Sequence, residues 1–136
     1  MMQNIRGEMI DNSRVPSRES KTHDLLFLSE LTEGWFALTN TRKQVGVGMV
    51  WDVVQFPYVW FWQVYGGGSG YPWYGRTYNL ALEPWTSMPN DGVVEAVKNG
   101  TAKTLRAGES VETELIVVVY TQKTKVDRID RQGNVY

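Results

Sequence analysis

Polar side chains that could bind a hydroxyl-bearing ligand are scattered among aromatic residues in the centre of the chain. Gln63 lies in a run of bulky apolar residues, and a buried amide needs partners, so it faces either a ligand or a neighbouring loop. Glu83 stands at the end of a predicted strand beside Trp85, which favours a ligand-facing carboxylate, and Asn79 shares its strand face. Arg76 offers charged donors to hydroxyls or to an anionic sugar, or else forms a surface ion pair.

The aromatic content strengthens this interpretation. The chain has six tryptophans and seven tyrosines but a single histidine. Aromatic rings are common in the lining of small-molecule pockets, and they stack on the apolar faces of pyranose rings. Trp35 and Trp85 lie near predicted turns and are candidate sugar platforms, whereas core packing is the competing role of Trp62. The candidate ligand-binding residues are Gln63, Trp62, Tyr74, Arg76, Asn79, Trp85 and Trp35.

Composition argues against several other classes of function. Without cysteine, the chain has neither disulfides nor thiolate metal sites, and His23 alone disfavours a cupin-type centre, so we expect no metal and no cofactor. The glycine-rich run 66–70 lacks the lysine of a phosphate-binding loop. The net charge of -1, with both signs interspersed, predicts no nucleic-acid partner, and the lack of a long apolar run predicts no membrane partner.

The elements that would position these residues are short strands. Apolar segments recur about every ten residues between turn signals, which is typical of an antiparallel sandwich. We predict an all-β fold, an antiparallel β-sandwich with one short helix over 91–98. The predicted strands cover 25–28, 35–39, 45–51, 58–65, 76–83, 101–105 and 111–120.

Three details of these strands carry structural predictions. Residues 58–65 are bulky on both faces, which predicts a central strand covered on both sides. Pro84 is predicted to end the strand before it. Gly46 and Gly48 share one face of their strand, where either a ligand or another backbone approaches or, as we favour, the glycines mark a bulge or close sheet packing.

Composition also divides the chain into three predicted regions. The polar composition of residues 1–21 predicts a flexible N-terminal arm. The same segment lacks the apolar core of a signal peptide, so we expect a cytoplasmic protein. Residues 22–122 form the β-sandwich domain. Residues 123–136 form a C-terminal tail, which either makes a hairpin around residues 132–134 or frays.

Several motifs, in order, resemble the C-terminal portion of galactose mutarotase-like proteins, the aldose 1-epimerase superfamily. The resemblance covers roughly residues 24–120 and only the last third to half of a full family member. Its motifs are Phe56-Pro57-Tyr58-x-Trp60-x-Trp62-Gln63, the glycine run, Tyr71-Pro72-Trp73-Tyr74-Gly75-Arg76, Leu82-Glu83-Pro84 and Leu105-x-x-Gly108-Glu109. The resemblance implies part of a large antiparallel β-supersandwich and places the family's catalytic glutamate at Glu83.

The resemblance leaves three functions open. The family pairs its glutamate with histidines that lie upstream of the matching region, so a carbohydrate-binding module without full epimerase activity is the leading prediction. An active aldose epimerase, an isomerase with Glu83 as base, would need an acid from His23, Tyr74 or a second subunit. A non-enzymatic assembly protein would use its aromatic residues as interface anchors. A homodimer, in which a second copy covers an exposed sheet, is compatible with each function.

Overall fold

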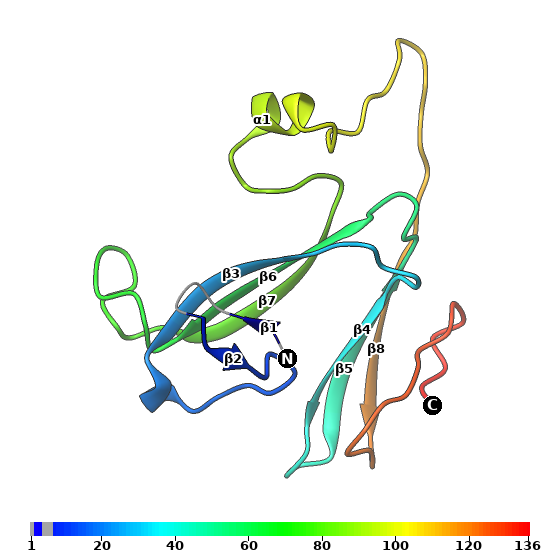
Figure 1. The fold of residues 1–136 in the computed structure, drawn as a ribbon. Coiled ribbons are helices and arrows are strands. Elements are labelled where there is room, and N and C mark those ends of the chain that lie inside the picture. The colour runs from blue at the N-terminus through cyan, green and yellow to red at the C-terminus, as the bar shows by residue number, and fades with distance from the viewer. Residues whose placement is uncertain (1, 4–6) are drawn as a thin grey trace. The chain divides into compact units, whose positions relative to one another are not determined.

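The computed structural model describes residues 2–3 and 7–136, in which β-strand is the main regular secondary structure (Figure 1). Two antiparallel three-stranded sheets and one short helix confirm the predicted all-β class and are consistent with a β-sandwich. The helix α1 spans Val93–Lys98, and a single 3-10 turn spans Arg18–Ser20. The strands are β1 (Met2–Gln3), β2 (Met9–Ile10), β3 (Thr22–Leu28), β4 (Trp35–Asn40), β5 (Val45–Trp51), β6 (Tyr58–Tyr65), β7 (Tyr78–Trp85) and β8 (Leu115–Thr121).

The strands pair in three sheets. The sheet orders are β1-β2, β3-β6-β7 and β4-β5-β8, so β6 is the central strand that its two bulky faces predict. The chain divides into two compact units, and each is described here by itself. The first unit combines Met1–Leu25 with Trp62–Ala81, and the second combines Leu26–Phe61 with Leu82–Tyr136. Residues 1 and 4–6 of the predicted N-terminal arm lie outside the described residues, and the flexibility of that arm stays a prediction.

Several strand boundaries differ from the prediction: β3 begins at Thr22, β4 ends at Asn40, β7 begins at Tyr78 and β8 ends at Thr121. Two further differences have a clear physical reason. Pro84 does not end its strand, because β7 continues to Trp85. β7 is an edge strand, where a proline can be accommodated because the missing N–H need not interrupt a ladder. β8 begins at Leu115 rather than at residue 111 because Leu115 pairs with Trp51, the last residue of β5. Residues 111–114 therefore have no β5 partner.

The predicted strand over 101–105 is wrong. The N–H groups of Thr101 and Ala102 both donate to the carbonyl of Ala96 at 2.9 Å. The Thr101 hydroxyl also donates to the carbonyl of Met88 at 2.8 Å. These bonds tie the segment to the end of α1, so its first backbone donors are used locally rather than in a ladder.

The glycine face of β5 is closely packed within the second unit. A Cβ atom on Gly46 would lie 2.3 Å from Cζ of Tyr120, whose hydroxyl is 2.6 Å from the Thr39 hydroxyl across the sheet. A Cβ atom on Gly48 would lie 2.1 Å from Cδ1 of Ile129. Both glycines make room for another side chain, which confirms the close-packing interpretation.

The C-terminal segment forms a hairpin, the first of its two predicted alternatives. Ile129 and Val135 form an antiparallel bridge, and the N–H of Tyr136 donates to the carbonyl of Arg128 at 2.9 Å. The Asp130 carboxylate accepts hydrogen bonds from the side chain and backbone of Asn134 and from the Tyr136 hydroxyl. These bonds, the side-chain bond from Asn134 above all, lower the pKa of Asp130 to about 2. The carboxylate thus holds the hairpin turn closed.

A hydroxyl group is buried without a partner in the first unit. Tyr65 is 1% exposed, and its ring lies 5.6 Å from that of Tyr78 with a 53° tilt. Its hydroxyl has no hydrogen-bond partner within residues 2–3 and 7–136. Burial first, and the nearby Tyr78 second, raise the pKa of Tyr65 to about 12.

Removing this hydroxyl should stabilise the protein. We expect Tyr65→Phe to raise the free energy of unfolding by about 1 kcal/mol, because a buried unpaired donor is costly. Because the folded state disfavours the ionised phenolate, the raised pKa also makes the free energy of unfolding fall as the pH rises from about 10 toward about 12. Chemical denaturation between pH 7 and 11 should therefore show that the free energy of unfolding falls less with pH in Tyr65→Phe than in the wild type. The exposed Tyr71→Phe is the control, and equal stabilities for all three proteins would contradict the prediction.

Candidate functional site

Two tryptophans form a partly exposed stack in the second unit. The rings of Trp60 in β6 and Trp85 in β7 lie 4.2 Å apart with an interplanar angle of 16°. Phe27 meets Trp60 edge-on at 5.5 Å, and the Trp60 indole N–H donates to the carbonyl of Ser87 at 2.9 Å. Trp60 is thus held on several sides, while Trp85 remains 39% exposed. The stack presents a supported indole ring to solvent.

The predicted carboxylate stands directly beside this ring. Glu83 and Trp85 are two residues apart in β7, so both side chains project from the same face of the strand. One oxygen of Glu83, Oε2, accepts the Trp85 indole N–H at 2.9 Å. None of the ion pairs among the described residues involves Glu83. We call Trp60, Glu83 and Trp85 the Trp85 platform, which offers an aromatic surface and a negatively charged acceptor.

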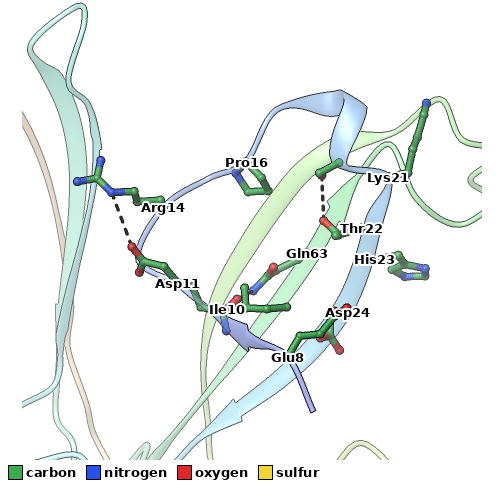
Figure 2. A pocket seen from close by; sticks show the side chains of 12 residues that line it. Glu8, Ile10, Asp11, Arg14, Pro16, Lys21, Thr22, His23, Asp24 and Gln63 are labelled. Atoms are coloured by element: carbon green, nitrogen blue, oxygen red, sulfur yellow. Dashed lines mark hydrogen bonds and ion pairs between the residues drawn. The ribbon is translucent and has the colours of Figure 1, made fainter. Parts of the chain in front are cut away.

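A polar cavity of about 440 Å³ lies in the first unit (Figure 2). Its walls come from β2 and the segment that follows it, from the start of β3, and from β6. We call it the Gln63 cavity, after its most buried polar residue. It is lined by Glu8, Ile10, Asp11, Asn12, Arg14, Pro16, Ser20, Lys21, Thr22, His23, Asp24 and Gln63.

Gln63 is the buried polar group of this cavity. It is 6% exposed, and its Nε2 donates to Oδ1 of Asn12 at 3.3 Å. The sequence left two roles open for this amide, a ligand or a loop. Asn12 supplies the loop partner, and the same side chain also lines the cavity.

An aromatic cluster adjoins the cavity through His23. The imidazole ring lies 6.1 Å from the ring of Trp73, and Trp73 lies 4.9 Å from Trp62. The glycine-rich run allows this approach, since a Cβ atom on Gly68 would lie 3.0 Å from Cδ1 of Trp73. Trp62 therefore packs against a loop tryptophan and is half-buried.

The predicted site residues fall into separate places. Trp62 and Gln63 are neighbours in β6, so their side chains point to opposite faces of the strand. Trp35 donates its indole N–H to Glu33 at 3.0 Å and lines another cavity of about 250 Å³. The structure brings together Glu83 and Trp85 but does not bring Trp35 to them.

The other predicted residues belong to the first unit. Tyr74 and Asn79 are exposed, and Tyr74 meets the ring of Tyr71 edge-on at 6.1 Å. The carbonyl of Arg76 accepts a hydrogen bond from the Arg18 guanidinium. Gln63, Trp62, Tyr74, Arg76 and Asn79 lie in the first unit and Glu83 in the second, so their grouping around one ligand stays a prediction.

Sequence reasoning missed most of the cavity wall. Asn12 and Lys21 fall in the segment that composition assigned to a flexible arm, and Asp24 lay next to a predicted strand without a role. The one feature of the sequence that points to the cavity is Gln63, because a buried amide needs a hydrogen-bond partner from elsewhere in the chain. That partner is 51 residues away in the sequence, and no local pattern identifies it.

The comparisons with known proteins supply no relative: no protein-family model, curated protein or solved structure matches the chain. The resemblance to galactose mutarotase-like proteins therefore stays a prediction. Within the described part of the chain, no helix is long and apolar enough to cross a membrane. The same residues contain no group of three histidine, cysteine, aspartate or glutamate side chains arranged to hold a metal ion.

Proposed function

We propose that this chain binds a carbohydrate on the Trp85 platform. One observation carries the proposal: a 39% exposed indole ring is backed by a second indole and hydrogen-bonded to a carboxylate at 2.9 Å. A pyranose has an apolar face of C–H groups and a rim of hydroxyls. An aromatic ring matches the face, and a carboxylate matches the rim.

The two parts of the platform contribute different energies. The ring of Trp85 is already ordered by Trp60, so stacking a sugar on it costs little side-chain entropy. Hydrogen bonds from hydroxyls to an ionised carboxylate are about twice as strong as bonds between neutral groups. The indole N–H that Glu83 accepts fixes one oxygen, which orients the carboxylate before the ligand arrives.

The same geometry favours binding over epimerisation. Mutarotation needs one group to take a proton and another to give one. The side-chain hydrogen bond that Glu83 makes in the described residues comes from an indole N–H, which is a donor only and a poor general acid. We therefore propose a binding module, with the epimerase as the alternative that a rate measurement would reveal.

Calorimetric titration with D-galactose, D-glucose and D-xylose tests the proposal. We expect saturable binding to the wild-type protein. Trp85→Ala should raise the Kd about tenfold, since aromatic contacts are worth about 0.5–1.5 kcal/mol beyond area burial. Glu83→Gln should raise it by a similar factor through loss of the charged acceptor. Glu112→Gln, at an exposed site elsewhere in the second unit, is the matched control.

The opposite outcomes are equally clear. A folded wild-type protein that binds none of the sugars would refute the proposal and favour the assembly alternative. Binding that survives both platform substitutions would move the site elsewhere. Polarimetry of freshly dissolved D-galactose should show the buffer rate, and a faster rate that Glu83→Gln abolishes would establish the epimerase instead.

A further inference from the structure

The Gln63 cavity has the size of a ligand site and no assigned role. Its volume of about 440 Å³ lies within the range of about 300–1,000 Å³ that is usual for small-molecule sites. Two contacts hold its wall in place. The Tyr78 hydroxyl donates to the carbonyl of Pro16 at 2.5 Å, and Gln63 donates to Asn12. Both join the segment after β2 to the sheet within the first unit.

The buried amide points to a ligand with hydroxyl groups. Gln63 is more than nine-tenths buried, and its nitrogen is satisfied by Asn12 at 3.3 Å. The bond to Asn12 is the hydrogen bond of this side chain among the described residues, and the side chain lines the cavity. A buried amide oxygen is ordinarily hydrogen-bonded. A donor inside the cavity would complete it.

The charges around the cavity favour a neutral ligand. Carboxylates of Glu8, Asp11 and Asp24 share the wall with the cationic side chains of Arg14 and Lys21. Asp11 and Arg14 lie 3.7 Å apart and largely offset each other. An anion entering here would face the carboxylates of Glu8 and Asp24, and a cation would face the Lys21 ammonium. A neutral molecule with several hydroxyls can donate to the first set and accept from the second.

We infer that the Gln63 cavity binds a small neutral polyhydroxylated molecule, a polyol or a single sugar ring. The site shares no residue with the Trp85 platform, and the inference does not rest on the proposed function. Gln63 anchors the ligand by accepting a hydroxyl, and Asn12 and Asp24 supply neighbouring polar groups. Figure 2 shows Gln63, Asp24 and His23 among the side chains that line this cavity.

His23 provides a direct reporter because it is the single histidine of the chain. Its imidazole Cε1–H resonance can be followed by NMR at constant pH while D-sorbitol, myo-inositol or D-galactose is added. We expect a saturable shift with at least one of these neutral probes. D-gluconate and D-glucosamine, which carry opposite charges, should bind about tenfold more weakly or not at all.

Two substitutions locate the binding. Gln63→Leu keeps the side-chain size but removes the acceptor, and Asn12→Ala removes its partner at a less buried position. Each should raise the Kd measured at His23 about tenfold, the value of one buried hydrogen bond. Ser69→Ala, an exposed serine that does not line the cavity, should change nothing. If Gln63→Leu fails to fold, the Kd of Asn12→Ala, measured at the His23 resonance, tests the inference.

The result is distinguishable from that of the proposed function. The Trp85 indole N–H resonance, identified by its loss in Trp85→Phe, reports the platform, while His23 reports the cavity. A ligand that shifts Trp85 but not His23 would overturn this inference and leave the platform intact. A ligand that shifts the His23 resonance but not the Trp85 resonance would support this inference and count against the platform. A His23 shift that is unchanged in both Gln63→Leu and Asn12→Ala would also overturn it.

Discussion

Replacing Gly34 by alanine should lower the free energy of unfolding by about 3 kcal/mol, from overpacking and a weakened backbone hydrogen bond. A Cβ atom at this position would lie 2.4 Å from the carbonyl oxygen of Trp51. The obstacle is backbone and cannot rotate away. The two residues are also hydrogen-bonded, because the N–H of Trp51 donates to the carbonyl of Gly34 at 2.8 Å.

Trp51 has little freedom to give way. It is buried, it ends β5 opposite Leu115, and its indole N–H donates to the carbonyl of Phe56 at 3.0 Å. Relieving the clash would therefore separate the ends of β4 and β5. Urea unfolding monitored by tryptophan fluorescence measures the effect, provided that the slope with denaturant is unchanged.

Gly70→Ala is the matched control for this measurement. No heavy atom lies within 4 Å of a Cβ atom built at Gly70, and the residue does not have a positive φ. Both substitutions restrict the unfolded chain equally, so their difference isolates the clash in the folded state. We expect Gly70→Ala to stay within about 0.5 kcal/mol of the wild type. Equal stabilities for the two variants would contradict the prediction.

The parts of the fold that the sequence predicts well are those with a local cause. The alternation of residues in β5 and the run of bulky residues in β6 place both strands at their observed bounds, Val45–Trp51 and Tyr58–Tyr65. The errors have non-local causes. Whether Pro84 ends a strand depends on whether β7 is at an edge, and where β8 begins depends on where β5 ends. Neither fact is contained in the segment itself.

The candidate site divides in the same way. Glu83 and Trp85 meet because they are two residues apart in one strand, which a period of two predicts. The Gln63 cavity depends on Asn12, which local composition cannot connect to β6. The first unit joins residues 1–25 with 62–81, and such a long-range pairing leaves no periodic trace in either segment. The predicted burial of the Gln63 amide is the one indirect indication of this cavity in the sequence.

The second large effect concerns Gly48 and the C-terminal hairpin. Gly48→Ala should lower the free energy of unfolding by about 1–3 kcal/mol, because overpacking a filled site forces side chains off their rotamers. Its Cβ atom would lie 2.1 Å from Cδ1 of Ile129. Ile129 is 2% exposed, so its terminal methyl group must move among buried neighbours to avoid the new atom. The clash therefore strains the contact between the hairpin and β5.

A second substitution should partly relieve this strain. Ile129→Val removes the Cδ1 atom that the new methyl group would meet, at a cost of about 0.5–1.5 kcal/mol when made alone. In the Gly48→Ala background the same change removes the clash, so the double variant should be more stable than additivity predicts by about 1 kcal/mol. Relief should be incomplete, because the carbonyl oxygen of Phe36 would still lie 3.0 Å from the new atom.

Denaturation of the wild type, both single variants and the double variant closes the cycle. Non-additivity of the expected sign would establish that Ile129 fills the space over Gly48 in solution, and hence that the hairpin belongs to the folded core of the second unit. Additive effects would place the hairpin elsewhere, since two residues that do not touch do not couple. The control pair is Gly48→Ala with Val135→Ala, which changes the hairpin strand opposite Ile129 without removing the clashing atom. That pair should show no comparable relief, because Cδ1 of Ile129 remains in place.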